Sequence, residues 1–165
     1  MHLKLGAILS RRLRRPGWQW RWQWRWRWPW NRNTPEDRLP AHLERGRRGE
    51  ELARCHLQRK GMKFLTANYR SRRGEIDLVF REMDCLVFVE VKTRSSEAWA
   101  RPAAAVNRQK RWRISRAALD YLRELGHPSV HLRFDVVEVI LGDGPAAEIR
   151  HLPACFTLSA PYRYG

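Results

Sequence analysis

Asp77, Glu90 and Lys92 lie in two neighbouring segments in which polar and apolar residues alternate. The segments cover residues 75–80 and 86–92, and their alternation with Val, Leu, Ile and Phe predicts two β-strands. A two-residue turn midway between them sets Asp77 directly across from Glu90, and Lys92 then shares their face of the sheet. Two carboxylates and one ammonium group are therefore predicted to converge on one patch.

Such a group of two carboxylates and an ammonium is one that can bind a divalent metal ion. Two carboxylates opposite each other in a sheet repel, and Mg²⁺, or Mn²⁺ in the same role, removes the conflict because it binds carboxylate oxygens and activates water. Lys92 is then placed to position a water or to hold a phosphate. The alternative is a solvated strand face on which Lys92 offsets the two acids.

Glu50 is a second acidic candidate. Residues 42–60 predict a helix that ends at Gly61, and Glu50 interrupts its small and apolar stripe. The other members of that stripe are Leu43, Gly46, Ala53 and Leu57. A buried acid is costly unless it is paired or bound to a metal, so Glu50 either points at the site or forms a structural hydrogen bond.

Five basic residues are candidates for contact with nucleic acid: Arg72, Arg73, Arg94, Lys110 and Arg111. The first two form a turn directly before the first acidic strand. The last two belong to a predicted helix over residues 103–125, where the lysine interrupts an apolar stripe just as Glu50 does. A basic helix beside carboxylates favours a track for phosphates, although basic residues usually form a solvated surface.

The predicted elements follow the order α-β-β-β-α-β-β, which indicates an α/β sandwich with a mixed central sheet. The remaining strands are expected at 62–69, 131–140 and 147–152, with a loop over 93–102 and the hairpin turn at 83–84. The second helix is expected to be the longest element. Asp135 is expected to pair with Arg133 or to support the centre of the sheet.

Charge and cysteine content limit the classes of protein to which the chain can belong. The chain of 165 residues has a formal net charge of +16, which favours a polyanionic partner such as nucleic acid. Its three cysteines, Cys55, Cys85 and Cys155, follow no metal or disulfide spacing, which fits a reducing cytoplasm. No apolar run is long enough to span a membrane, so a cytoplasmic protein is expected.

Residues 1–40 differ in composition from the rest and carry half of the net positive charge. Tryptophan occupies every even position from Trp18 to Trp30, with Arg, Gln and Pro between. Three interpretations stay open: a disordered low-complexity tail, adhesion to unpaired bases, or contact with a membrane interface. The predicted organisation is this tail, a domain over residues 41–157, and a short C-terminal tail over 158–165.

Several short motifs recur together in one order along residues 42–155, and together they carry a resemblance. They are Gly46-x-x-Gly49-Glu50, Asn68-x-Arg70, Gly74-Glu75-Ile76-Asp77, Val89-Glu90-Val91-Lys92-Thr93-Arg94, Lys110 and Arg133-Phe134-Asp135-Val136. The set resembles the YraN family of uncharacterised bacterial proteins. Its Asp77 and Glu90-Val91-Lys92 resemble the D…ExK core of restriction-endonuclease-like nucleases, which include archaeal Holliday-junction resolvases.

The resemblance implies an endonuclease-like fold and a metal-dependent hydrolysis of DNA phosphodiester bonds, with branched or structured DNA as a candidate substrate. Asp77, Glu90 and Glu50 are then the expected metal ligands, and these three residues with Lys92 are the expected catalytic set. A homodimer is also considered, because archaeal resolvases act as dimers. The competing hypotheses are a non-catalytic nucleic-acid-binding module on the same scaffold and a membrane-surface protein driven by the tail.

Overall fold

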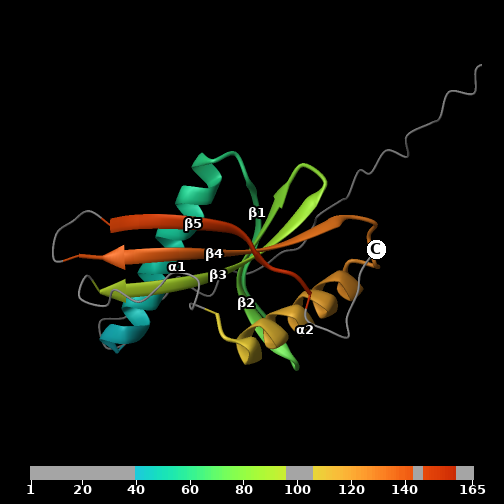
Figure 1. Ribbon diagram of the computed structural model, residues 1–165, viewed down its shortest axis with the longest axis horizontal. Helices are drawn as coiled ribbons and strands as arrows, with labels where there is room; N and C mark the ends of the chain where they lie inside the picture. The colour runs from blue at the N-terminus through green and yellow to red at the C-terminus, as the bar shows by residue number, and fades with distance from the viewer. Residues whose placement is uncertain (1–39, 96–105, 143–146, 159–165) are drawn as a thin grey trace, which may run out of the picture. The chain divides into compact units, whose positions relative to one another are not determined.

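The computed structural model describes residues 40–95, 106–142 and 147–158, which form two helices and five strands in the expected order (Figure 1). The elements are α1 (Ala41–Arg59), β1 (Lys63–Ser71), β2 (Gly74–Glu82), β3 (Cys85–Ser95), α2 (Arg108–Glu124), β4 (His131–Leu141) and β5 (Ala147–Phe156). The predicted α/β class is therefore confirmed. Residues 1–39, which make up almost all of the predicted N-terminal tail, lie outside the described residues.

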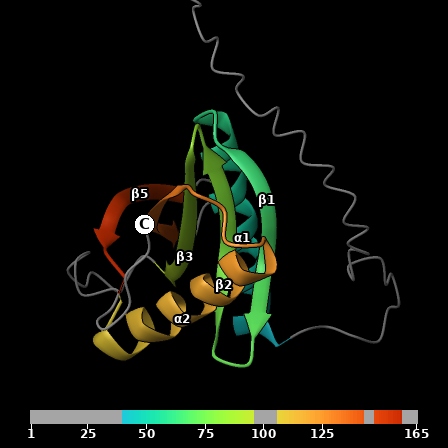
Figure 2. The ribbon, with the colours of Figure 1, turned by 90° about the vertical axis from the view of Figure 1, so that its right-hand side faces the viewer.

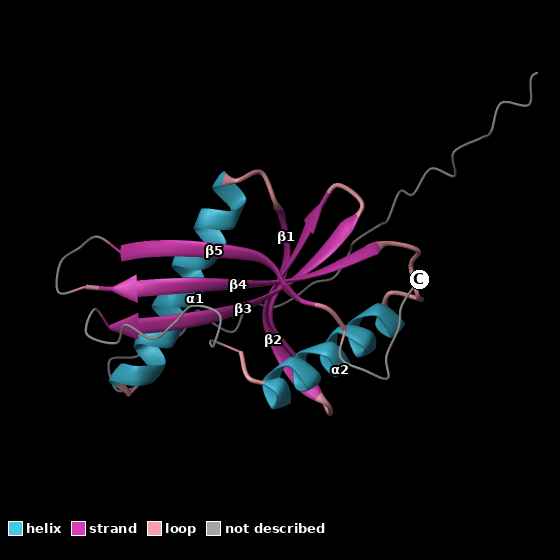
Figure 3. Ribbon diagram, viewed as in Figure 1, coloured by secondary structure: helices cyan, strands magenta, loops and turns pink. Residues whose placement is uncertain are grey.

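The five strands form one mixed sheet in the order β1-β2-β3-β4-β5. The pair β3–β4 is parallel, and the other three pairs are antiparallel. A parallel pair needs a crossover connection, and α2 lies within the one between β3 and β4. The helices α1 and α2 cover opposite faces of the sheet (Figures 2 and 3). The predicted mixed sheet is thus confirmed, with β3 and β4 adjacent in its interior.

The hairpin between β2 and β3 has the predicted register. Glu82 pairs with Cys85, and Met83 in the intervening turn takes a positive φ of 52°. The ladder of paired residues runs from there to Leu78 and Val89. Asp77, the next residue along β2, uses its side chain instead, because its Oδ2 accepts a hydrogen bond from the Val91 N–H at 2.7 Å.

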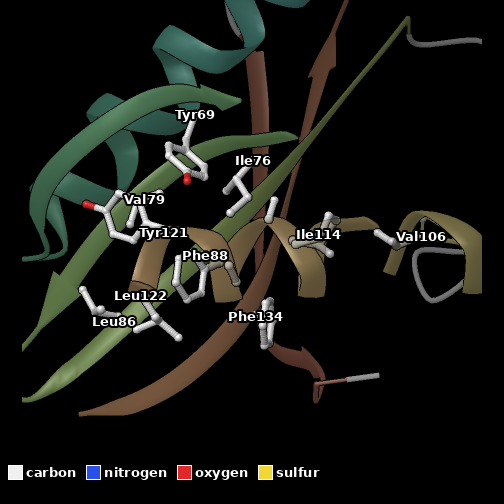
Figure 4. Close-up of a cluster of buried hydrophobic side chains, with 13 residues drawn as sticks. Tyr69, Ile76, Val79, Leu86, Phe88, Val106, Ile114, Tyr121, Leu122 and Phe134 are labelled. Atoms are coloured by element: carbon white, nitrogen blue, oxygen red, sulfur yellow. The ribbon is translucent and has the colours of Figure 1, made fainter. Parts of the chain in front are cut away.

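Each face of the sheet carries its own apolar core. The core under α2 contains Ile76, Val79, Phe88, Ile114 and Tyr121 among others, and Figure 4 shows these side chains packed together. The core under α1 is built from a second set: Ala53, Leu57, Met62, Leu78, Phe80, Val87, Val89, Val137 and Val139.

The cores correct one prediction from the alternation of residues. Strict alternation over residues 75–80 predicts that Ile76 and Leu78 share a face of the sheet, but Ile76 packs in the core under α2 and Leu78 in the core under α1. The regular alternation of faces is therefore broken at Asp77, which lies between them. On the neighbouring strand, Asn68 takes a positive φ of 52° close to this point. The irregularity frees the Asp77 side chain to reach the backbone of β3.

Several predicted boundaries are wrong, and the final strand, for example, runs from Ala147 to Phe156 where it was expected to end at residue 152. The second helix begins at Arg108 rather than at Ala103, because Asn107 caps it by accepting a hydrogen bond from the Lys110 N–H at 2.8 Å. It has 17 residues and is shorter than α1, which has 19. The first three residues of the predicted loop, 93–95, belong instead to β3, which continues to Ser95 in parallel pairing with β4, and residues 96–102 of that loop lie outside the described residues. Neither described helix is long and apolar enough to cross a membrane.

Candidate functional site

Glu90 is the centre of the candidate site. It lies in β3 with 2% of its surface exposed, and an ammonium group approaches each of its carboxylate oxygens. Lys92 Nζ donates to Oε1 at 2.7 Å, and Lys110 Nζ from α2 lies 3.2 Å from Oε2. That second contact is an ion pair only, because Oε2 accepts no hydrogen bond with good geometry from the described residues. Buried carboxylates with such an oxygen are costly to keep ionised.

Asp77 lies beside Glu90 and has an unusual protonation equilibrium. Its own burial and the nearby charge of Glu90 raise the pKa of Asp77 to about 7, while the Val91 N–H and Lys110 act in the opposite direction. Near neutral pH this carboxyl group therefore holds a proton for part of the time. The two carboxyl groups are thus close enough for the charge of Glu90 to act on Asp77, but the ladder of paired residues ends at Leu78 and Val89, so the predicted direct pairing of Asp77 with Glu90 is absent.

Glu50 approaches from α1 and is held by a hydrogen bond. Asn68 Nδ2 in β1 donates to Glu50 Oε2 at 3.2 Å. Burial raises the pKa of Glu50, the bond from Asn68 lowers it, and the charges of Glu75 and Glu90 raise it further. The structural alternative for Glu50 is therefore present, with Asn68 as its partner, and a role in holding metal or water stays a prediction.

The position of Glu50 depends on a close approach of α1 to β3. Gly49 is buried, and a Cβ atom at that position would collide with the Thr93 side chain. A residue without a side chain is therefore needed for α1 to pack this tightly on β3, one residue before Glu50. Gly46, one turn earlier, has nothing within 4 Å of the equivalent position.

The five basic candidates have different surroundings. Lys110 joins the carboxylates and also lies 3.5 Å from Glu75 Oε1. Arg73 instead forms a two-pronged ion pair with Asp120 of α2, and hydrogen bonding to Arg73 lowers the pKa of Asp120 to about 2. Arg73 therefore ties the β1–β2 turn to α2.

The other three basic candidates also differ in their partners and in their exposure to solvent. Arg111 donates to the Val106 carbonyl at 2.8 Å and lies over the Phe156 ring, so it has a structural function at the start of α2. Arg94 is half-buried in β3, and Arg72 is exposed at the β1–β2 turn. Contact with a phosphate stays a prediction for all of them, and Arg72 has the most accessible side chain.

The described ranges contain no group of three or more His, Cys, Asp or Glu residues close enough to hold a metal ion. The predicted set of Asp77, Glu90 and Glu50 is therefore not assembled as three ligands. The donor chemistry of the pair Asp77 and Glu90 nevertheless fits a hard divalent cation, because both supply carboxylate oxygens and the buried Glu90 Oε2 accepts no hydrogen bond of good geometry from its ion-pair partner Lys110.

Three residues near the site were not assigned a function by the sequence analysis. Asn68, Glu75 and Glu138 contact or border the cluster, and Glu138 pairs with Lys92 in the parallel ladder. Glu138 is 3% exposed, and its Oε1 has no hydrogen-bond partner within the described part of the chain. Asn68 and Glu75 belong to the ordered set of motifs that carries the family resemblance, so the sequence contained a signal for them. No sequence pattern pointed to Glu138, because its burial depends on the parallel pairing of distant strands.

A second buried carboxylate, Asp135 in β4, has very different surroundings. Its oxygens lie 2.9 Å from Arg133 Nε, 2.8 Å from His151 Nε2 and 3.0 Å from the Ala154 N–H. Burial alone would raise the pKa of Asp135, but the hydrogen bonds from His151, Arg133 and Ala154 outweigh it and lower the pKa. Lys60 Nζ lies 2.9 Å from His151 Nδ1 and completes the network. The expected partnership of Asp135 with Arg133 is confirmed.

Fold and site together define an α/β protein with a five-stranded mixed sheet and a buried cluster of carboxylates and lysines beside its parallel strand pair. Residues 49–139, more than half of the chain, match the Uncharacterised protein family UPF0102. The chain belongs to this family, which confirms the resemblance to YraN proteins.

Curated relatives agree along most of their length. A UPF0102 protein of Rhodococcus jostii (strain RHA1) is 44% identical over 115 residues, which cover 70% of this chain and 98% of the relative. A UPF0102 protein of Anaeromyxobacter dehalogenans (strain 2CP-C) is 45% identical over 113 residues, which cover 67% and 82%. A third, from Geobacter sulfurreducens, is 40% identical over 114 residues, which cover 69% and 89%.

Proposed function

We propose that the protein is a metal-dependent endonuclease that hydrolyses phosphodiester bonds in DNA, with branched or structured DNA as its substrate class. The observation that carries this proposal is the pair of adjacent carboxylates, Asp77 and Glu90, with the Lys92 ammonium group 2.7 Å from Glu90. Their order along the chain is that of the D…ExK core, and membership of the uncharacterised family is consistent with such a core.

Each residue of the cluster has a defined task in this proposal. Asp77 and Glu90 would hold Mg²⁺ or Mn²⁺, which when bound supplies electrophilic stabilisation of the phosphate and a reactive water. Lys92 is placed to donate a hydrogen bond to a phosphate oxygen or to the attacking water. Glu50, kept in place by Asn68, accepts a proton from that water or orients it. The raised pKa of Glu50 suits proton transfer better than an ordinary exposed carboxylate does.

The proposed partner is DNA because of the charge of the protein. A formal net charge of +16 favours a polyanion through phosphate neutralisation and release of counter-ions. Arg72 at the β1–β2 turn is an exposed basic residue in the loop that directly precedes β2, which carries Asp77. The proposal includes a cytoplasmic location, and it leaves the homodimer and a membrane contact of the tail as predictions.

One observation favours a second function, a non-catalytic module that binds nucleic acid. Lys92 and Lys110 together neutralise Glu90 without any metal, as a purely structural ion cluster would do. In that case DNA binding would depend on salt but not on divalent cations.

Cleavage of DNA by the full chain tests the proposed function. Labelled four-way junctions, flaps and linear duplexes are incubated with Mg²⁺ or Mn²⁺, and DNA affinity is measured in parallel. We expect Glu90→Ala to lower the cleavage rate by at least ~100-fold while DNA affinity changes by less than about threefold. Glu148→Ala is the matched control, because Glu148 is an acidic residue of edge strand β5 paired with Arg150.

Two outcomes contradict the proposal. If Glu90→Ala cuts DNA as fast as the wild type, the carboxylate pair is not the catalytic site. If the wild type binds DNA tightly and cuts none of these substrates with either metal, the non-catalytic module is the better account.

A further inference from the structure

Lys110 occupies a position that the proposed function leaves unexplained. It comes from the first turn of α2, and its side chain reaches across to the buried Glu90 in β3. Its ammonium group lies 3.2 Å from Glu90 Oε2 and 3.5 Å from Glu75 Oε1. Glu90 Oε1 accepts a hydrogen bond from Lys92 Nζ, so Oε2 is the oxygen that faces Lys110.

The backbone that carries Lys110 is held firmly against the sheet. The Lys110 N–H caps onto Asn107, and a Cβ atom at Gly74 in β2 would collide with the Arg113 carbonyl, so α2 and β2 are in close contact. Further along α2, Asp120 is bound by Arg73 of the β1–β2 turn. Movement of the Lys110 ammonium group therefore needs only rotations of its long side chain, which is flexible in lysine.

A divalent cation and the Lys110 ammonium group compete for the same oxygen. Both are cations attracted to Glu90 Oε2, and a divalent ion bound to that oxygen at ~2.1 Å would be repelled by an ammonium group that lies 3.2 Å from the same atom. Glu75 offers Lys110 a second acceptor, and its side chain is 54% exposed where that of Glu90 is 2% exposed. A path thus leads from the buried carboxylate towards solvent.

We infer that Lys110 is an internal counter-ion of Glu90, which a divalent cation displaces, and that the released ammonium group then binds a phosphate of the DNA. This inference rests on the proposed function and adds a regulatory step to the same site. Without metal, Lys110 stabilises the carboxylate cluster and makes no contact with DNA. With metal, its charge is transferred to the substrate side, so metal and DNA bind cooperatively.

Displacement also reconciles the predicted phosphate contact of Lys110 with the position of its ammonium group 3.2 Å from Glu90 Oε2.

Calorimetric titration of the full chain with Mn²⁺ tests the competition. We expect Lys110→Met to bind Mn²⁺ at least ~10-fold more tightly than the wild type, because the competing cation is gone. Arg108→Met is the matched control, since Arg108 is an exposed basic residue of the same helical turn. The Mn²⁺ affinity of this variant should stay within about twofold of the wild-type value. Lys110→Gln gives a second variant that keeps a hydrogen-bond donor if the first does not fold.

The possible results separate the two levels of the account. If the wild type binds Mn²⁺ and neither Lys110 variant binds it more tightly, the displacement is refuted while the metal site stands. If no folded variant binds Mn²⁺, the metal site of the proposed function and the displacement are both refuted.

DNA affinity measured with and without Ca²⁺ tests the second half of the inference, since Ca²⁺ also binds carboxylate oxygens. We expect Lys110→Met to weaken DNA binding about threefold or more with Ca²⁺ present and to leave it unchanged without Ca²⁺. Equal weakening under both conditions would show that Lys110 binds phosphate without being displaced. No weakening under either condition would show that the released lysine does not contact DNA.

Discussion

Two buried carboxylates lie one step apart on the central parallel strands and have opposite electrostatic surroundings. Val89 pairs with Asp135 and Glu90 pairs with Val136, so Asp135 and Glu90 point to opposite faces of the sheet. Asp135 receives hydrogen bonds from Arg133, His151 and a backbone N–H, and its pKa is lowered. Glu90 accepts one hydrogen bond of good geometry, from Lys92, and has Lys110 as an ion-pair partner at its other oxygen, while the pKa of its neighbour Asp77 is raised.

The difference separates a structural network from a candidate site. A carboxylate whose lone pairs are filled by hydrogen bonds stabilises the fold and has no capacity left for a ligand. Two nearby carboxylates repel each other when both are ionised, which lowers the stability of the fold, and a bound cation reduces this repulsion. Both carboxylates are buried, so the number of hydrogen bonds that each accepts is the main difference between the two clusters.

The largest expected effect follows from removing the structural acid. Asp135→Ala would leave Arg133 and His151 without their shared partner, and we expect the free energy of unfolding to fall by about 3–5 kcal/mol. Urea denaturation measures this loss. Glu148→Ala, which breaks a partly exposed pair with Arg150, should cost less than about 1 kcal/mol. A loss for Asp135→Ala as small as the control would mean that the network is not structural.

The opposite sign is expected at Asp77. Its pKa is about 7 in the folded protein against 3.8 for an ordinary Asp, so the folded state binds the extra proton between these values. Stability is therefore lost as pH rises through this window. At about pH 8 without metal, Asp77→Asn should raise the free energy of unfolding by roughly 2–4 kcal/mol, because the amide keeps an acceptor for the Val91 N–H without the charge.

Urea denaturation at about pH 4 and about pH 8 checks this sign, with Asp135→Asn as the comparison. The pKa of Asp135 is lowered, so its contribution is present at neutral pH and is lost in acid, and Asp135→Asn should destabilise the protein at the higher pH. If Asp77→Asn were also destabilising there, Asp77 would belong to the structural class.

A smaller effect on stability is expected from substitutions of the glycines in α1, which change packing and leave every charge in place. Gly49→Ala should destabilise the fold by about 1–3 kcal/mol, because the new methyl group collides with Thr93. Gly46→Ala is the control on the same helix, and it should be neutral or stabilising by up to about 1 kcal/mol, because it fills open space and favours the helix. Thermal unfolding distinguishes the two, and equal values would remove the case for a required close approach at Gly49.

The smallest expected effect concerns the residue that holds Glu50. Asn68→Ala and Asn68→Gly both remove the hydrogen bond to Glu50, but glycine tolerates the φ of 52° and alanine does not. Asn68→Ala should therefore be less stable than Asn68→Gly by about 1 kcal/mol. Chemical denaturation of the pair measures the backbone contribution, and identical stabilities would show that the left-handed conformation is not costly here.

The parts of the fold that depend on neighbouring residues were predictable from the sequence. The alternation of polar and apolar residues and the turn at Met83 determine the register from Glu82–Cys85 to Leu78–Val89. The order of helices and strands followed from the spacing of apolar residues and from the Gly and Pro residues that separate the elements. Residues such as Glu50 and Lys110 stood out because each interrupts an apolar stripe. Local patterns therefore identified the participants of the site.

The partners of those residues could not be predicted, because they come from distant segments. Lys110 contacts Glu90 and Arg73 contacts Asp120 only because α2 packs across β2. The continuation of β3 to Ser95 depends on β4, and the break in alternation at Asp77 depends on β1 and β3. The same long-range pairing buries Glu138, for which no local signal existed.

A crystal structure grown with Mn²⁺ and a short DNA duplex tests the central claim most directly. The account predicts an anomalous density peak at the Mn²⁺ edge between the carboxylates of Asp77 and Glu90, with the Lys110 ammonium group moved away from Glu90 Oε2. No peak at this position in crystals that contain DNA, with Lys110 still paired to Glu90, would contradict it and show that the cluster is a structural ion network.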